Sequence, residues 1–365
     1  MIRWLLATRW KRSMLALLVL LGVLLLLGIF YIDAVNLDNH RRIEEYRQRL
    51  GGANAAEVWA VSLDRRDPQL FPLRDRSWIK QSDLIMELLR QEDENDVVAL
   101  TIDQRQQIME ALRQSGTFHP PEVFDMETPF NLVEIMGIGR RWEHSGSEDS
   151  LDQQQQLVRW HQGLEFVESL SGGGVLINEL VRESLLKTFL QSAHKWLDLA
   201  DEQELLRVAS TLSRIEPPRQ ALLRALQVET MVFLDLFSGE LVEEYGDANL
   251  WIPICFDLKY FLDHYPEWSL DPFDQDNWAH LSEPPPYYAP ITSLLTPQYQ
   301  SLLNRVTEID AQLQALRAAF DAMISRKSGQ QWQPPEGIER IVNEDGTVRI
   351  RVTGGPAGTE VYLPR

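Results

Sequence analysis

Hydrophobic residues follow three patterns along the chain: one continuous run near the start, helical stripes through the middle, and alternation near the end. The continuous run covers residues 14–32, which are 19 residues without a charge. A helix of that length rises roughly 28 Å, close to the hydrocarbon thickness of a bilayer. Trp4 and Trp10 precede the run and Tyr31 lies at its end, where membrane proteins place aromatic side chains. The pattern predicts one transmembrane helix in contact with the lipid bilayer.

The charges on the two sides of this run predict its orientation. Four basic residues precede the run, and Asp33 and Asp38 follow it. Basic residues that flank a membrane helix stay on the cytoplasmic side, so residues 1–13 are predicted to be cytoplasmic and the bulk extracytoplasmic. The residues after the run offer no cleavage site with small side chains. We therefore expect an uncleaved, single-pass signal anchor with an extracytoplasmic domain.

Polar residues return after the run. Residues 36–50 are charged and are predicted to continue the membrane helix until Gly51 and Gly52 stop it. A mixed region follows, and its last helix opens with a capping box formed by Thr101 and Gln104. The elements predicted in this region are a short strand at 56–63 and helices at 81–91 and 101–116.

Helical periodicity dominates residues 148–237, which are predicted to form a bundle. One of these helices follows the three glycines at 172–174 and is apolar on two faces, as expected of a central helix. The glycines are not a phosphate-binding loop, because Glu179 stands where such a loop has a lysine. They are predicted to form the hinge of a helical hairpin. Pro217 and Pro218 are predicted to open the next helix.

The strongest periodicity lies in residues 291–325, where apolar side chains recur at steps of four and three for about four heptads. The favoured interpretation is a long helix that packs on the bundle of its own chain, because the flanking positions lack a regular alternation of Glu and Lys. The alternative is self-association, or contact with a protein partner, through residues 295–323. In that alternative the interaction seam is Leu302, Val306, Ile309, Leu313, Leu316 and Phe320.

The periodicity changes to two after residue 328. An Asp345–Gly346 turn separates alternating residues, which predicts a hairpin, and a third short strand is expected near the end. The predicted fold is mainly α, with a single N-terminal transmembrane helix, an extracytoplasmic helical bundle and a small C-terminal β hairpin or three-stranded tail. The predicted regions are 1–13 (cytoplasmic), 14–32 (anchor), 33–140 (membrane-proximal, mixed α), 141–328 (bundle, including 238–290 and 291–325) and 329–365 (β tail).

Residues 238–290 are rich in aromatic residues and prolines and are predicted to be packed loops around one helix near 254–264. Acids lie beside tryptophans here, an arrangement found where enzymes hydrolyse glycans. Asp271, Asp274 and Asp276 also cluster, but the segment lacks the central glycine and terminal glutamate of a calcium loop. The candidate ligand-site residues of this region are Glu267, Trp268, Asp274, Asp276 and Trp278.

The composition excludes several kinds of chemistry. The formal charge is −19, and no basic patch follows the anchor, so the sequence predicts no nucleic-acid binding. Cys255 is the only cysteine, which rules out an intrachain disulfide and cysteine-rich zinc modules. Ser77, Ser184 and Ser192 each begin an S-x-x-K triplet, but the companion motifs of penicillin-binding enzymes are missing. The seven histidines are dispersed, so no catalytic residue, cofactor or metal site is predicted.

The order of elements resembles a group of membrane-anchored, mainly helical exported bacterial proteins with no established activity. The resemblance rests on the anchor, the helical hairpin, the segments "IEPPRQALLRALQVETMVF" and "QALRAAFDA", and the proline-marked β tail. It covers roughly residues 150–350, and its motifs are packing motifs. The resemblance implies topology, which for such proteins is single-pass in a bacterial inner membrane with a periplasmic domain, and it implies no activity.

These observations lead us to expect a single-pass, membrane-anchored binding or scaffold protein of the cell envelope. Contacts are expected through the helix at 291–325 or the aromatic region at 245–290. The alternative is an envelope hydrolase acting on glycan or peptide, with its acids in that aromatic region.

Overall fold

The protein is mainly helical, with a small three-stranded antiparallel sheet at its C-terminus. The computed structural model describes residues 2–64, 100–114, 132–143, 153–170, 176–238, 248–274 and 299–364, together with residues 286, 289 and 292. The helices are α1 (Ile2–Leu50), α2 (Ala55–Asp64), α5 (Ile102–Gln114), α6 (Leu132–Glu143), α7 (Gln153–Ser169), α8 (Leu176–Ser192), α9 (His194–Leu199), α10 (Glu202–Arg214), α11 (Pro218–Ser238), α13 (Ala248–Leu270) and α15 (Tyr299–Lys327).

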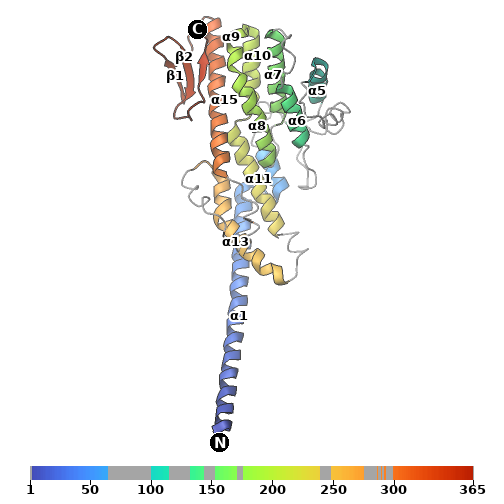
Figure 1. The fold of residues 1–365 in the computed structure, drawn as a ribbon, viewed down its shortest axis with the longest axis vertical. Coiled ribbons are helices and arrows are strands. Elements are labelled where there is room, and N and C mark those ends of the chain that lie inside the picture. Colours follow the sequence, from blue (N-terminus) through green and yellow to red (C-terminus); the bar gives the residue numbers. More distant parts are fainter. Residues whose placement is uncertain are drawn as a thin grey trace.

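Helix α1 is 49 residues long and stands out from the rest of the molecule (Figure 1). Within the described residues it is the one helix that is long and apolar enough to cross a membrane. The helix extends without a break to Leu50, so the predicted continuation through residues 36–50 is confirmed. Its last part lies against the bundle. The helix ends at Leu50, and Gly51 follows with φ of 83°, a conformation that costs glycine little and other residues more.

The strand predicted at 56–63 is wrong, because these residues form α2. The sequence signal for a helix lies just before them. Asn54 accepts a hydrogen bond from the amide of Glu57, whose carboxylate accepts one from the amide of Ala53. This reciprocal pair satisfies amides at the helix start that have no intrahelical partner. The predicted capping box of Thr101 and Gln104 is confirmed at the start of α5.

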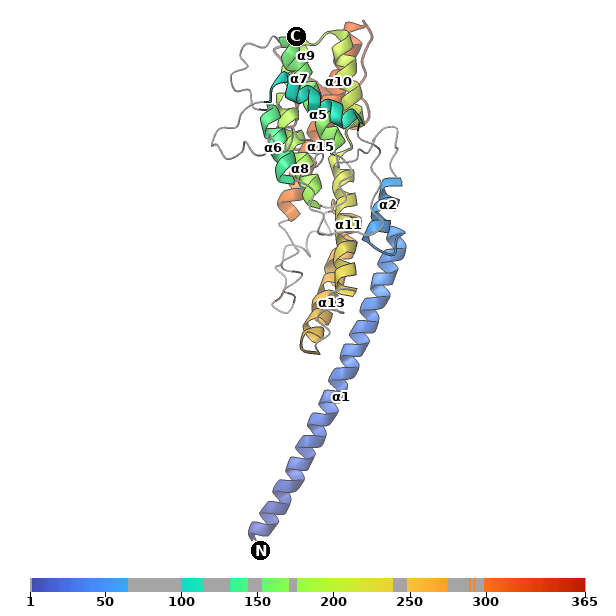
Figure 2. The ribbon, with the colours of Figure 1, turned by 90° about the vertical axis from the view of Figure 1, so that its right-hand side faces the viewer.

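Two separate hydrophobic cores fill the bundle. The α1-side core is formed by side chains of α1, α2, α11, α13 and the beginning of α15. The sheet-side core is formed by side chains of helices α5 to α10, the remainder of α15 and the sheet. Figures 1 and 2 show these two parts stacked along the long axis, with the N-terminus at one end and the C-terminus at the other.

Helix α15 runs through both cores, and the heptad seam is buried within the chain. Leu302 and Val306 belong to the α1-side core, whereas Ile309, Leu313 and Phe320 belong to the sheet-side core. Leu316 is buried beside them. The seam residues are thus buried among helices of their own chain.

The C-terminal residues form the predicted hairpin and third strand. Strand β1 (Ile338–Val342) pairs antiparallel with β2 (Val348–Val352), and β2 pairs antiparallel with β3 (Val361–Leu363). Ile350 and Val361 are register partners and are buried in the sheet-side core. The sheet therefore covers one side of α15 (Figure 1).

Basic side chains bind the free carbonyl groups at several helix ends. Arg159 donates to the carbonyl of Trp142 near the end of α6. Arg317 of α15 donates to the carbonyls of Leu212 and Ile215 at the end of α10. The last carbonyls of a helix can accept further hydrogen bonds, so these arginines bind acceptors at the helix ends and join neighbouring helices.

Candidate functional site

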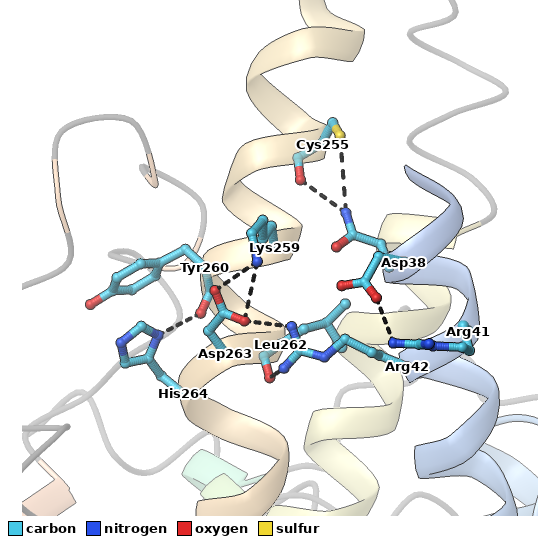
Figure 3. A network of polar contacts seen from close by, with 10 residues as sticks. Asp38, Arg41, Arg42, Cys255, Lys259, Tyr260, Leu262, Asp263 and His264 are labelled. Atoms are coloured by element: carbon cyan, nitrogen blue, oxygen red, sulfur yellow. Dashed lines mark hydrogen bonds and ion pairs between the residues drawn. The ribbon is translucent and has the colours of Figure 1, made fainter. Parts of the chain in front are cut away.

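The first candidate site is the junction between α1 and α13, where polar contacts join the membrane-type helix to the bundle (Figure 3). Asn39 is buried, and its amide donates to the carbonyl of Cys255 at 3.1 Å. The hydroxyls of Tyr46 and Ser269 share a hydrogen bond of 2.5 Å. Both contacts are buried, so each would leave an unsatisfied polar group if the two helices separated.

Arg42 binds α13 where a proline interrupts the helix. Pro266 has no amide hydrogen, so the carbonyl of Leu262 four residues earlier has no helical partner. The guanidinium group of Arg42 donates to this carbonyl and also to the carboxylate of Asp263. Lys259 contacts the same carboxylate at 3.1 Å. Helix α13 continues past residue 264, where the predicted helix ended, and Arg42 satisfies the carbonyl that Pro266 leaves without a helical partner.

The end of α1 is held by α11 as well. Asp235 of α11 accepts from the guanidinium of Arg47 at 3.0 Å and from the amide of Ala55 at 2.8 Å. Ile43 and Leu50 are buried in the α1-side core. The second half of α1 is therefore part of the folded domain, and no flexible linker separates the domain from the exposed apolar helix.

The second candidate site is a group of buried charges that we call the charge layer: Glu179, Arg182 and Glu183 of α8, Glu216 before α11, and Arg224 of α11. The side chain of Arg182 donates to Glu179 at 2.6 Å. Arg224 donates to both carboxylate oxygens of Glu216 and lies 3.5 Å from Glu179. The pairs are bidentate or bridging, the geometry in which buried guanidinium and carboxylate groups offset the cost of their dehydration.

Glu183 differs from the other acids of the charge layer. Its side chain is 0% exposed, and neither carboxylate oxygen has a hydrogen-bond partner among the described residues. Burial raises the pKa of Glu183 to about 8, and the charges of Arg182 and Arg305 offset part of this effect. At neutral pH Glu183 is therefore mainly protonated, which leaves two carboxylates and two guanidinium groups in the layer.

The charge layer lies between the two hydrophobic cores. On α8, Leu176 belongs to the α1-side core and Leu185 to the sheet-side core. On α15, Val306 and Ile309 fall on the two sides in the same way. The layer is buried and closed, so it is suited to holding three chain segments in register and not to turning over a substrate. Ion-pair networks with such a role also perturb pKa values.

A small cleft of about 210 Å³ lies on the outside of the bundle, between α5, α7 and α10. Glu165, Glu168 and Arg214 line it, and Arg214 pairs with Glu168 at 3.1 Å. His161 on the same face of α7 shares a hydrogen bond of 2.8 Å with Thr211, and burial lowers its pKa. These groups bind one another, and the described residues contain no group of three or more His, Cys, Asp or Glu that could hold a metal ion.

Of the five candidate ligand-site residues at 267–278, the structure describes the side chains of Trp268 and Asp274. Trp268 is buried in the α1-side core, whereas Asp274 is exposed. Asp276, Trp278 and the side chain of Glu267 lie outside the described residues. In the S-x-x-K triplet of Ser184, Lys187 pairs with Glu308 at 3.1 Å.

Sequence reasoning missed the charge layer. It recognised α8 as a central helix from its two apolar faces and noted Glu179 only as evidence against a phosphate loop. The missed signal was the spacing of Glu179, Arg182 and Glu183, which puts three charges on one side of a helix that is otherwise apolar.

Comparison with known proteins found no match to a family model, a curated protein or a solved structure. The resemblance to exported bacterial proteins therefore stays an expectation, and the geometry carries the functional argument.

Proposed function

We propose that this protein is a membrane-anchored scaffold or binding protein, which holds its helical bundle at a fixed position above the bilayer of a bacterial cell envelope. One observation carries the proposal. Helix α1 is a single unbroken helix whose apolar run is exposed from Leu17 to Tyr31, and whose last part is built into the core.

The exposed part of α1 fits a lipid environment. Its large side chains from Leu17 to Tyr31 are about half exposed or more, and Leu25 and Phe30 reach 65% and 68%. A continuous apolar surface of this kind is costly in water, at about 25 cal/mol for each Å². Water-soluble monomers rarely expose one, so the bilayer is the partner that this surface favours.

The buried junction supports a scaffold. An enzyme domain on a membrane tether needs no fixed orientation, and a flexible linker would serve it. Here Asn39, Arg42 and Tyr46 bind α13 directly, so the bundle and the membrane helix form one rigid unit. Such a unit sets both the distance and the direction of the bundle relative to the bilayer.

A pair of leucine variants tests the anchoring. Leu24 and Leu37 are both exposed on α1, but Leu24 lies within the apolar run and Leu37 lies beyond it. We expect Leu24→Glu combined with Leu21→Glu and Leu27→Glu, all exposed on α1, to move the chain from the membrane fraction into the soluble or aggregated fraction, because each charge near the bilayer centre costs about 3 kcal/mol. Leu37→Glu should stay in the membrane fraction after carbonate extraction. Equal fractionation of the two variants would contradict anchoring by this run.

The orientation is tested on the same helix. With the N-terminus in the cytoplasm, a cysteine at Leu37, which is 74% exposed, should react with a membrane-impermeant maleimide added outside cells whose outer membrane has been made permeable. Cys255 is buried, so the unmodified chain provides the background. Labelling that requires lysis of the inner membrane would reverse the proposed orientation.

A further inference from the structure

Helix α13 runs in the same direction as α1, which decides where its beginning lies. Along α1, Asn39, Arg42 and Tyr46 contact residues of increasing number on α13, namely Cys255, Asp263 and Ser269. The part of α13 that precedes Cys255 therefore points toward the exposed apolar part of α1. Figures 1 and 2 agree, since both show the beginning of α13 as the described part of the bundle nearest the N-terminal end of α1.

A contact between two aromatic rings places the beginning of α13 relative to the end of the apolar run. Tyr31, near the end of the apolar run, stacks on Phe256 with ring centroids 6.1 Å apart. If the run spans the bilayer, Tyr31 lies at the membrane surface, and so does the ring of Phe256. Asn39 of α1 lies level with Cys255, so the helix backbone from residue 255 back to residue 248 descends about 10 Å, to about the level of Ile32 at the end of the apolar run.

The composition of this segment suits the membrane interface. Its sequence is "ANLWIPIC", which contains a tryptophan and no charged residue. The first charged residue after it, Asp257, is buried and accepts hydrogen bonds from the amide of Thr292 at 3.0 Å and from its hydroxyl at 2.5 Å. The charge that ends the segment is thus bound inside the protein and does not oppose contact with lipid.

We propose that residues 248–255 at the beginning of α13 form a second membrane contact, which lies in the headgroup region of the bilayer that α1 spans. This inference rests on the proposed anchoring. Tryptophan and aliphatic side chains are favoured at that depth. Two contacts at different positions fix the tilt and the rotation of α1, which a single membrane helix leaves to its surroundings.

Depth-dependent quenching in vesicles tests the proposal with the full chain. In a Cys255→Ala background, single cysteines replace Asn249 or Trp251 and carry an environment-sensitive fluorophore. The vesicles contain phosphatidylethanolamine and phosphatidylglycerol, with a nitroxide either at the headgroup or at the end of an acyl chain. We expect both labels to be quenched several-fold more strongly by the headgroup nitroxide than by the acyl-chain nitroxide.

Two control labels make the outcomes distinguishable. A label at Leu24, within the apolar run, should be quenched by the acyl-chain nitroxide, and a label at Leu206, exposed on α10, by neither. If the Leu24 label is quenched but those at 249 and 251 behave like the Leu206 label, the second contact is refuted while the anchoring stands. If the Leu24 label is unquenched, both proposals fail. Two positions are used so that a fold defect in one variant, detected by circular dichroism, leaves the other to decide.

Discussion

Replacing Glu183 by glutamine probes the buried charge layer, because the substitution keeps the shape of the side chain and removes its proton equilibrium. The wild-type carboxyl faces Glu179 and Arg182 on its own helix and Arg305 and Asp310 on α15. None of these groups hydrogen-bonds either of its oxygens. Glutamine stays neutral at every pH, so it never presents an uncompensated charge to this environment.

The sign and the size follow from the pKa. The pKa of Glu183 rises from 4.5 to about 8 on folding, so between these values the folded chain holds a proton that the unfolded chain has released. The wild type therefore loses stability as pH rises through this window, by about 1.4 kcal/mol for each pH unit. The loss ends above the folded pKa. From about pH 5 to about pH 8 it amounts to roughly 4 kcal/mol.

We expect the free energy of unfolding of Glu183→Gln to match that of the wild type near pH 5 and to exceed it by about 2–4 kcal/mol near pH 8. The measurement is urea unfolding of the full chain in detergent micelles, followed by far-ultraviolet circular dichroism at several pH values. Glu44→Gln is the matched control, since Glu44 is exposed on α1 and its loss should change stability little at any pH.

A difference between Glu183→Gln and the wild type that stays constant from about pH 5 to about pH 8 would refute the reasoning. It would mean that Glu183 is ionised throughout and that the neighbouring arginines compensate its charge. Other titrating groups, including Glu229, whose pKa burial raises to about 7, act equally in both chains and cancel in the comparison.

Two further substitutions test the packing. Glu216→Leu leaves the buried Arg224 without its bidentate partner and should lower the free energy of unfolding by about 3–5 kcal/mol, and adding Arg224→Leu should recover part of that loss in a double-mutant cycle. Gly163→Ala should destabilise the protein by about 1–3 kcal/mol in the same urea assay, although alanine is the better helix former. The reason is that a methyl group there would lie 2.2 Å from the ring of Phe189, and an unchanged unfolding midpoint would show that the ring moves aside.

Local signals in the sequence determined the parts of the fold that depend on neighbouring residues. Three elements are specified by residues that lie within them. These are the apolar run at 14–32, the capping box at Thr101 and the Asp345–Gly346 turn. The heptad of α15 also specified a long helix with one apolar seam. Helix, cap and turn were predicted correctly at these places.

The tertiary structure decided what depends on residues distant in the sequence. The heptad pattern is the same whether its seam meets another chain or its own bundle, and only the tertiary structure shows Leu313 buried among helices of its own chain. Helix α13 continues past Pro266, and Arg42, over two hundred residues earlier, donates to the carbonyl that the proline leaves without a helical partner. The residues that neighbour Pro266 in the sequence give no indication of that hydrogen-bond donor.

The charge layer also separates what the sequence determines from what the tertiary structure determines. The sequence placed Glu179 and Glu183 on a helix with two apolar faces, which made them candidates for burial. Only the folded chain brings Glu216 and Arg224 to α8, and their positions decide that Glu179 is paired while Glu183 is left without a hydrogen bond. The charge and the spacing of these residues are properties of the sequence. Their dehydration and their pairing depend on the three-dimensional surroundings, and these two effects set the pKa of each carboxyl group.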